Sequence, residues 1–222
     1  MISRLPKWIL LGGSVLSLMG GFINAIGFVS VYHEAVTHLT GTTTTLGIAV
    51  ANGDTAAALP LIATVFSFVL GAAASAFFIK DAVLQLGRRY GAVMMMEGVL
   101  LFASAYLLGR GQWLGLALAT GACGMQNGMV SAFSGAVVRT THVSGILTDL
   151  GILIGQSLRG LPVDQRKAKL YSALAASFFA GAVFGAWCFV RLGALALCVP
   201  ATVLFSIGIC YIIYWHRQRA RR

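Results

Sequence analysis

Two copies of one polar motif lie within an otherwise apolar sequence. The first copy joins Gly21-Phe22-Ile23-Asn24 to Thr37-His38-Leu39-Thr40-Gly41, and the second joins Gly124-Met125-Gln126-Asn127 to Thr141-His142-Val143-Ser144-Gly145. Their hydroxyl, amide and imidazole groups can bind a small polar solute, whereas burying them without partners costs free energy. Within a membrane, such residues indicate a functional site by default. We therefore predict a solute-binding site whose candidate residues are Asn24, His38, Thr40, Gly41, Asn127, Thr141, His142, Ser144 and Gly145.

Three charged residues are candidates for coupling solute movement to an ion or a proton. Asp149 follows the second motif copy, and its counterpart after the first copy is the neutral Thr45. Arg139 likewise has only Ala35 as its counterpart. This asymmetry predicts either an Asp149–Arg139 pair or an ion site built on one half of the chain. Glu97 is the sole acid within its apolar segment, so it is either an interfacial residue or a coupling site.

No enzyme signature accompanies these residues. His33-Glu34 followed by His38 imitates a zinc-protease motif, but it lacks the spacing of four residues that puts both histidines on one helix face. The sequence also lacks a Gly-x-Ser-x-Gly elbow, a P-loop and a Gly-rich dinucleotide fingerprint. A metal site formed by His38, His142 and Asp149 is the less favoured alternative for the polar motif. We expect neither enzymatic activity nor a resident metal or cofactor.

Composition predicts an integral membrane protein. Hydrophobic residues make up 58% and charged residues only 10% of the 222 residues, whereas soluble domains carry about 25% charge. The net charge of +10 does not indicate nucleic-acid binding, because the basic residues lie at the ends of apolar segments, where they set topology. The four cysteines all fall in apolar segments and lack the spacing of a metal or disulfide framework. We expect a single transmembrane domain over residues 1–222.

Six segments are long enough to cross a bilayer, which takes about 20 apolar residues. They cover residues 8–31, 57–79, 91–109, 112–137, 170–190 and 193–215. Two shorter apolar stretches, 41–52 and 145–158, are either half-helices or parts of broken spans. Six full spans leave nearly all of the 16 lysines and arginines on one side, whereas eight spans divide them more evenly. The positive-inside rule therefore favours six spans, with both termini in the cytoplasm.

The repeat extends beyond the motif to two internal repeats, approximately residues 8–109 and 112–215. Leu59-Pro60 recurs as Leu161-Pro162, and Ser67-Phe68 recurs as Ser177-Phe178. Each half contains three full spans, an odd number, so the second half is predicted to be inverted relative to the first, as in many transporters. Small residues at helical spacing predict close helix packing; they are Gly71/Ser75, Gly124/Gly128 and Gly181/Gly185.

Inversion also predicts where the short helices lie. They would enter the membrane from opposite faces, beginning at Gly41 and Gly145, and their N-termini would meet near the bilayer midplane. Each N-terminus carries roughly half a positive charge, which attracts anions or the negative end of a dipole. Thr40 and Ser144 would occupy the N-cap positions, where hydroxyl side chains are favoured.

The motif also carries a family resemblance. Its pairing of Gly-x-x-Asn with His-x-Thr-Gly resembles the YoaK family, a bacterial membrane family classed among domains of unknown function. The string Arg139-Thr140-Thr141-His142-Val143-Ser144-Gly145-Ile146-Leu147-Thr148-Asp149 carries the same resemblance. It covers almost the whole chain, and Thr42 departs from the asparagine that is common in the family. The resemblance implies a multi-pass protein of the bacterial inner membrane.

Two half-helices whose N-termini meet within a membrane indicate a site through which a solute crosses the bilayer. We expect a secondary transporter of a small solute, with anions favoured by the helix ends. A small-solute or ion channel is the runner-up, because channels also build selectivity sites from two half-helices. A non-transporting structural or partner-binding membrane protein is the third alternative. The expected partners are the solute, the lipid bilayer and, as a candidate, a second copy of the chain, but not nucleic acid.

Overall fold

The computed structural model describes residues 8–30, 32–33, 36–79, 88–134 and 138–220. These residues form helices and connecting loops, with no β-strand among them. The helices are α1 (Trp8–Val29), α2 (Leu39–Ala51), α3 (Thr55–Phe78), α4 (Arg89–Gly109), α5 (Leu114–Ser134), α6 (Val143–Leu158), α7 (Gln165–Leu192), the 3-10 helix η2 (Gly193–Leu197) and α8 (Cys198–Ala220). Residues 31 and 135–137, which end two of the predicted spans, lie outside the described residues.

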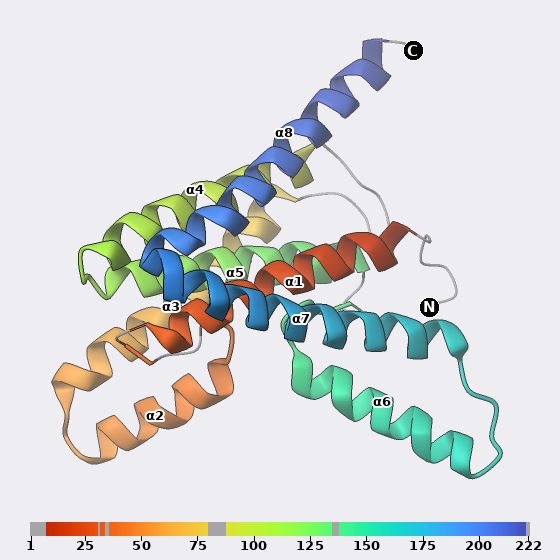
Figure 1. Cartoon of the computed structure of the whole chain (residues 1–222), viewed down its shortest axis with the longest axis horizontal. Coiled ribbons are helices and arrows are strands. Elements are labelled where there is room, and N and C mark those ends of the chain that lie inside the picture. Colours follow the sequence, from red (N-terminus) through yellow and green to blue (C-terminus); the bar gives the residue numbers. More distant parts are fainter. Residues whose placement is uncertain (1–7, 31, 34–35, 80–87, 135–137, 221–222) are drawn as a thin grey trace.

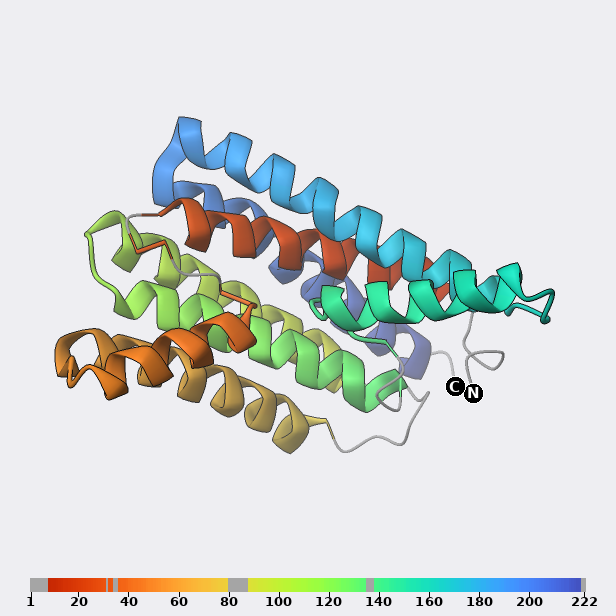
Figure 2. The same cartoon turned by 90° about the horizontal axis from the view of Figure 1, so that it is seen from below.

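The long helices form a bundle, and the two short helices lie at its opposite ends (Figure 1). α1 packs along α7, α3 along α5, and α4 along α8. Each short helix begins near the middle of the bundle and runs outward, α2 to the left and α6 to the right in both views (Figure 2). The start of α1 and the end of α8 lie at the same end of the bundle.

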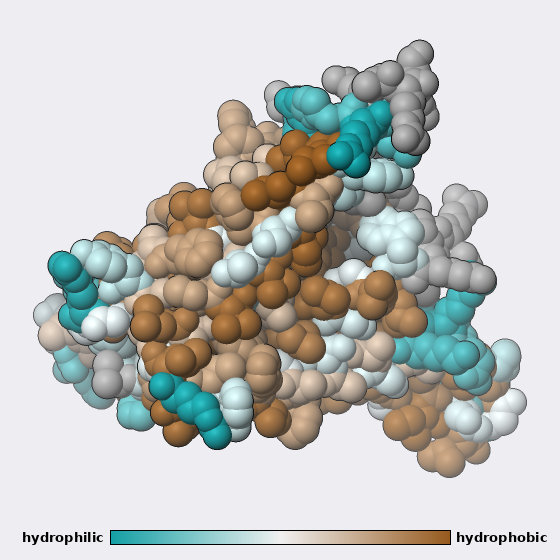
Figure 3. Space-filling view, turned by 45° about the horizontal axis from the view of Figure 1, so that its top comes forward, coloured by the Kyte–Doolittle hydropathy of each residue, from teal (hydrophilic) through white to brown (hydrophobic). Residues whose placement is uncertain are grey.

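The exterior of the bundle is that of a protein embedded in a membrane. Four helical stretches are long and apolar enough to cross a bilayer: Trp8–Val29, Thr55–Phe78, Arg89–Gly109 and Gln165–Gln218, the last of which contains both α7 and α8. Apolar side chains cover the middle of the face drawn in Figure 3, and hydrophilic residues gather toward its edges. Large apolar side chains are also exposed, and Phe77 and Phe179 are each more than 70% exposed. The chain is therefore an all-helical protein with membrane-protein character.

Glycines bring two pairs of helices unusually close together. A Cβ atom added to Gly21 of α1 would lie 2.0 Å from the carbonyl oxygen of Phe178 in α7, and one added to Gly124 of α5 would lie 2.2 Å from that of Phe68 in α3. These distances leave no room for any side chain, so only glycine permits both crossings. The α1–α7 and α3–α5 crossings thus use corresponding residues of the two motif copies.

The same crossings confirm that the predicted small-residue spacings pack helices. Gly181 and Gly71 each meet a backbone carbonyl oxygen of the facing helix, at 2.0 Å from the built Cβ in both cases. Gly185 meets the Phe22 backbone, and the built Cβ of Gly128 would clash with the Ser75 side chain. Close backbone approach at small residues is how helices associate in a lipid environment.

The α4–α8 pair is closed by a reciprocal contact. A Cβ added to Gly98 would lie 2.9 Å from the carbonyl oxygen of Ala201, and one added to Gly208 would lie 2.6 Å from that of Gly91. The contact is therefore symmetric. Gly98 of α4 is equivalent to Gly208 of α8, and Gly91 of α4 is equivalent to Ala201 of α8.

Candidate functional site

A cavity of about 400 Å³ lies between the N-terminal ends of α2 and α6. It also receives one residue from each of the long helices α1, α3 and α7. We call it the tip cavity; its lining residues are Asn24, Thr37, His38, Leu39, Thr40, Phe68, Thr141, His142, Val143, Ser144, Leu147 and Phe178. The two motif copies are far apart in sequence, but both contribute residues to the lining of this one cavity, which has polar and apolar side chains.

Each motif asparagine holds the chain that leads into a short helix. The Asn24 Oδ1 atom accepts hydrogen bonds from the backbone N–H and the hydroxyl of Thr37, both at 2.9 Å. The Asn127 amide nitrogen donates to the Thr141 hydroxyl at 2.7 Å and to the Cys123 carbonyl at 2.9 Å. The polar residues of the motif thus have a positioning role, because these bonds fix where α2 and α6 begin.

A buried network of side-chain hydrogen bonds supports the second of these loops. The Gln126 amide nitrogen donates to the Thr140 hydroxyl at 2.9 Å and to the Leu16 carbonyl at 3.0 Å. The Ser17 hydroxyl lies within hydrogen-bonding distance of the Thr140 and Leu174 carbonyl oxygens. These contacts attach the loop before α6 to α1 and α7, so the two halves of the chain are joined beside the tip cavity.

Both short helices begin two residues earlier than the sequence predicts. Their N-caps are His38 and His142, so the prediction of Thr40 and Ser144 as N-caps is wrong. Each histidine has a non-helical backbone, with φ near −90°, directly after the residue that a motif asparagine holds. Thr40 and Ser144 fall within the first helical turn, where their exposed side chains line the tip cavity.

The ends of α2 and α6 lack side-chain caps. Neither the His38 nor the His142 side chain accepts a hydrogen bond from the first turn, and the first intrahelical bonds run from the N–H groups of Thr42 and Ile146 to the backbone carbonyls of the two histidines. The backbone N–H groups before Thr42 and Ile146 are therefore open to a ligand. By contrast, Asp54 caps α3 and Asp164 caps α7 with carboxylate oxygens.

Three of the predicted binding residues lie outside the lining of the tip cavity. Gly41 and Gly145 occupy the first turns of the short helices without lining it, and Asn127 stands behind Thr141. A Cβ added to Gly145 would have nothing within 4 Å, and one added to Gly41 would meet only the His38 ring at ordinary contact distance. Close backbone approach by another residue therefore does not explain either glycine. The structure brings the other six candidates together.

The predicted charged residues lie apart from one another. Asp149 is exposed on α6 and lies near the Tyr171 side chain of α7, and it forms no ion pair with Arg139, although both residues are described. Arg139 lies near His142 instead. Glu97 is fully buried in α4, where neither carboxyl oxygen has a hydrogen-bond partner among the described residues. None of the three lines the tip cavity.

Phe68 and Phe178 are lining residues that the prediction of the site missed. Their backbones meet Gly124 and Gly21, and their side chains line the tip cavity. The recurrence of the Ser-Phe dipeptide in both halves was the available signal. Within the described part of the chain, no group of three or more His, Cys, Asp or Glu side chains is arranged to hold a metal ion.

Comparison with protein families identifies one family whose model matches most of the chain. The model of a family described as "Protein of unknown function (DUF1275)" matches residues 12–210. The chain belongs to this family. The match spans both motif copies and all the helices except the ends of α1 and α8, in agreement with the resemblance seen in the sequence. No curated protein and no solved structure matches the chain.

Proposed function

We propose that this DUF1275 protein is a secondary transporter that binds a small anionic solute in the tip cavity. The observation that carries the proposal is that two uncapped helix N-termini open onto one cavity. Each such end carries roughly half a positive charge and a set of free N–H donors. Discontinuous helices that point their N-termini at an anionic group are a recurring device of transporters.

The chemistry of the lining favours an anion over a cation. None of the residues that line the tip cavity is acidic. The hydroxyls of Thr40 and Ser144 and the rings of His38 and His142 can donate hydrogen bonds into it, together with the open N–H groups. Phe68 and Phe178 provide apolar walls. A small anion with a short apolar part, such as a carboxylate, fits these donors and walls.

We further propose six membrane spans arranged as two inverted repeats. The glycine crossings support this arrangement, because α1 on α7 and α5 on α3 use corresponding residues, and so do the two Asn–Thr contacts. The charge distribution of the sequence supports a position in the bacterial inner membrane with both termini in the cytoplasm. Asp149, Arg139 and Glu97 are the candidates for ion or proton coupling.

A channel is the second candidate. It is favoured by the same pair of half-helices, because two such ends also suit a selectivity site that a solute passes without being held. A transporter requires coupling or exchange, whereas a channel conducts only down a gradient. Counterflow in proteoliposomes separates the two, because labelled solute accumulates against unlabelled solute only in a transporter.

Binding is tested by thermal unfolding of the purified protein with formate, acetate, phosphate or sulfate, each added singly. A ligand present at 100 times its Kd stabilises the folded state by about 2.7 kcal/mol. For a chain of this size that corresponds to an increase in Tm of roughly 5 to 10 °C, at about 2–4 °C per kcal/mol. The anion that produces this increase is then used in the counterflow assay.

The variant Thr40→Leu/Ser144→Leu should remove the stabilisation, because it fills the tip cavity with apolar side chains. Its matched control is Gly47→Leu/Gly151→Leu, which changes the same two helices at exposed positions where a built Cβ meets nothing within 4 Å. The control should respond to the anion as the wild type does. Stabilisation of the Thr40→Leu/Ser144→Leu protein by the same anion would show that the site lies elsewhere.

A further inference from the structure

Glu97 occupies the most unusual environment of any acidic residue that the structure describes. It lies near the middle of α4, is 0% exposed, and neither of its carboxyl oxygens has a hydrogen-bond partner among the described residues. The titratable group beside it is the buried Cys123 thiol of α5. The α8 residues that meet α4 next to it, Ala201 and Phe205, are apolar. An ionised carboxylate without a partner is too costly to bury in such a place, so Glu97 must carry a proton here.

α4 packs tightly against α5 along the part of α4 that follows Glu97. A Cβ added to Gly115 of α5 would lie 2.7 Å from the Leu108 side chain and 2.9 Å from the Ser104 carbonyl oxygen, both in α4. The Ser104 hydroxyl also donates to the Gly115 carbonyl at 2.7 Å.

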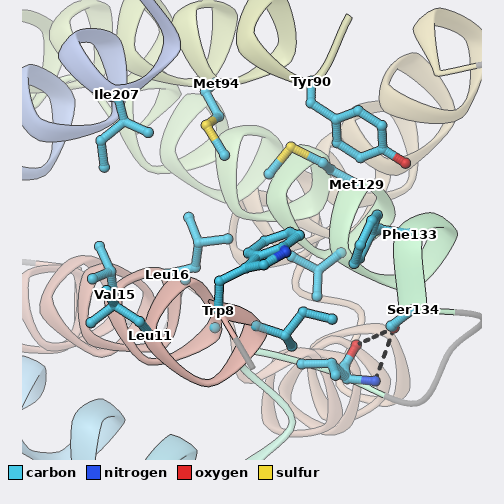
Figure 4. Close-up of a pocket in the computed structure, with 15 residues that line it drawn as sticks. Trp8, Leu11, Val15, Leu16, Tyr90, Met94, Met129, Phe133, Ser134 and Ile207 are labelled. Atoms are coloured by element: carbon cyan, nitrogen blue, oxygen red, sulfur yellow. Dashed lines mark hydrogen bonds between the residues drawn. The ribbon is translucent and has the colours of Figure 1, made fainter. Parts of the chain in front are cut away.

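The corresponding surface in the other half of the chain is open. An apolar groove of about 350 Å³ is lined mainly by α1 and α5, and Met94 of α4 and Ile207 of α8 also reach it, so it separates α1 from both of these helices (Figure 4). Its walls include Trp8, Gly12 and Leu16 of α1, Met94 of α4 and Ile207 of α8. α1 scarcely contacts α8. A Cβ added to Gly12 would meet only Trp8 of its own helix, at 3.7 Å.

The groove beside α1 and the packed interface between α4 and α5 occupy equivalent places in the two repeats. Gly12 precedes Gly21 by as many residues as Gly115 precedes Gly124, and Ile207 precedes Gly208 as Glu97 precedes Gly98. The helix pair α1–α8 therefore corresponds to the pair α5–α4. One pair stands apart and the other is closed, although the sequence repeat relates them. Two inverted repeats that exchange such conformations give alternating access.

We propose that Glu97 is a proton-binding site of this transporter. Protons reach Glu97 in a second conformation, in which α4 is separated from α5 in the way that α1 is separated from α8 in this structure. The inference rests on the proposed transport function and inverted repeat, and it deepens them by assigning the coupling ion. A proton binds the Glu97 carboxylate while the α4–α5 interface is open and stays bound when the interface closes. Solute movement is thereby tied to the state in which Glu97 is neutral.

Two reagents test the proposal without any knowledge of the solute. Dicyclohexylcarbodiimide adds to protonated carboxyl groups in apolar surroundings, because the acid proton moves to its nitrogen as the carboxyl oxygen attacks its central carbon. N-ethylmaleimide reports opening through Cys123, in protein whose other cysteines are changed by Cys188→Ala, Cys198→Ala and Cys210→Ala. Both reactions are followed by mass spectrometry of protein in lipid vesicles.

We expect Glu97 and Cys123 to be modified in the folded protein, with Glu97→Gln removing only the carbodiimide adduct. A matched control keeps Cys188, which is also buried, as the single cysteine, and we expect it to stay unmodified. Modification of Cys123 without that of Glu97 would overturn the proton site, because the carboxyl would be reached without carrying a proton. An unreactive Cys123 would overturn the opening, whatever happens at Glu97. Neither result depends on anion binding in the tip cavity, which the Thr40→Leu/Ser144→Leu variant tests by itself.

Discussion

Gly124→Ala should destabilise the protein by forcing α3 and α5 apart. The new Cβ would lie 2.2 Å from the Phe68 carbonyl oxygen and within 3.0 Å of two more backbone atoms of Phe68. Non-bonded heavy atoms prefer separations of about 3.5 Å, so α5 must move by roughly 1 Å. Overpacking of this kind costs about 1–3 kcal/mol. At about 2–4 °C per kcal/mol for a chain of this size, Tm should fall by roughly 2 to 12 °C.

Thermal unfolding of purified protein in one detergent measures this effect, and Gly145→Ala is the control. A Cβ at Gly145 would meet nothing within 4 Å, and replacing a helical glycine by alanine stabilises a helix by at most about 1 kcal/mol. Its Tm should therefore stay unchanged or rise slightly. If Gly124→Ala unfolds at the wild-type temperature, the close crossing of α3 and α5 at Phe68 is wrong.

Three further predictions follow from the contacts. Asn24→Leu removes both hydrogen bonds to Thr37, so it should lower the free energy of unfolding by about 1–3 kcal/mol and weaken the anion-induced increase in Tm; an unchanged response would show that this loop does not position α2. Asp149→Asn should leave Tm almost unchanged, because Asp149 is exposed and forms no ion pair with Arg139; a fall in Tm that Arg139→Gln reverses would revive the predicted ion pair. In a background without native cysteines, Gln112→Cys should react with an impermeant thiol reagent on intact cells and Gln218→Cys should not, since labelling of both would contradict the proposed topology.

Composition and the repeated motif predicted the helical membrane class, the family and six of the residues that line the tip cavity. They succeeded because apolar composition and the spacing of polar residues are local properties of the sequence. The starts of the short helices were missed, because Asn24 and Asn127 hold Thr37 and Thr141 through contacts between distant residues. A helix can begin directly after such an anchored residue, whatever the capping preference of Thr40 or Ser144.

Other features of the site could not be predicted for the same reason. Nothing near Gln126 indicates that it bonds Leu16 and Thr140, and its counterpart in the first motif copy is the apolar Ile23. The predicted partner of Asp149 was Arg139, which is close in sequence, but the fold brings Tyr171 of α7 beside it.

The pairing of the long helices has a consequence for how the chain is made. α1 pairs with α7 and α3 with α5, whereas α1 and α3 do not contact each other within the described residues. When synthesis has reached the end of α4, the glycine-lined faces around Gly21 and Gly71 still await helices that the ribosome has not produced. Membrane insertion of the first half must therefore precede its packing, and the nascent half must wait in the bilayer with its backbone-contact surfaces covered only by lipid. Two fragments divided between α4 and α5 would each lack the α1–α7, α3–α5 and α4–α8 pairings, and only their lateral association would form them.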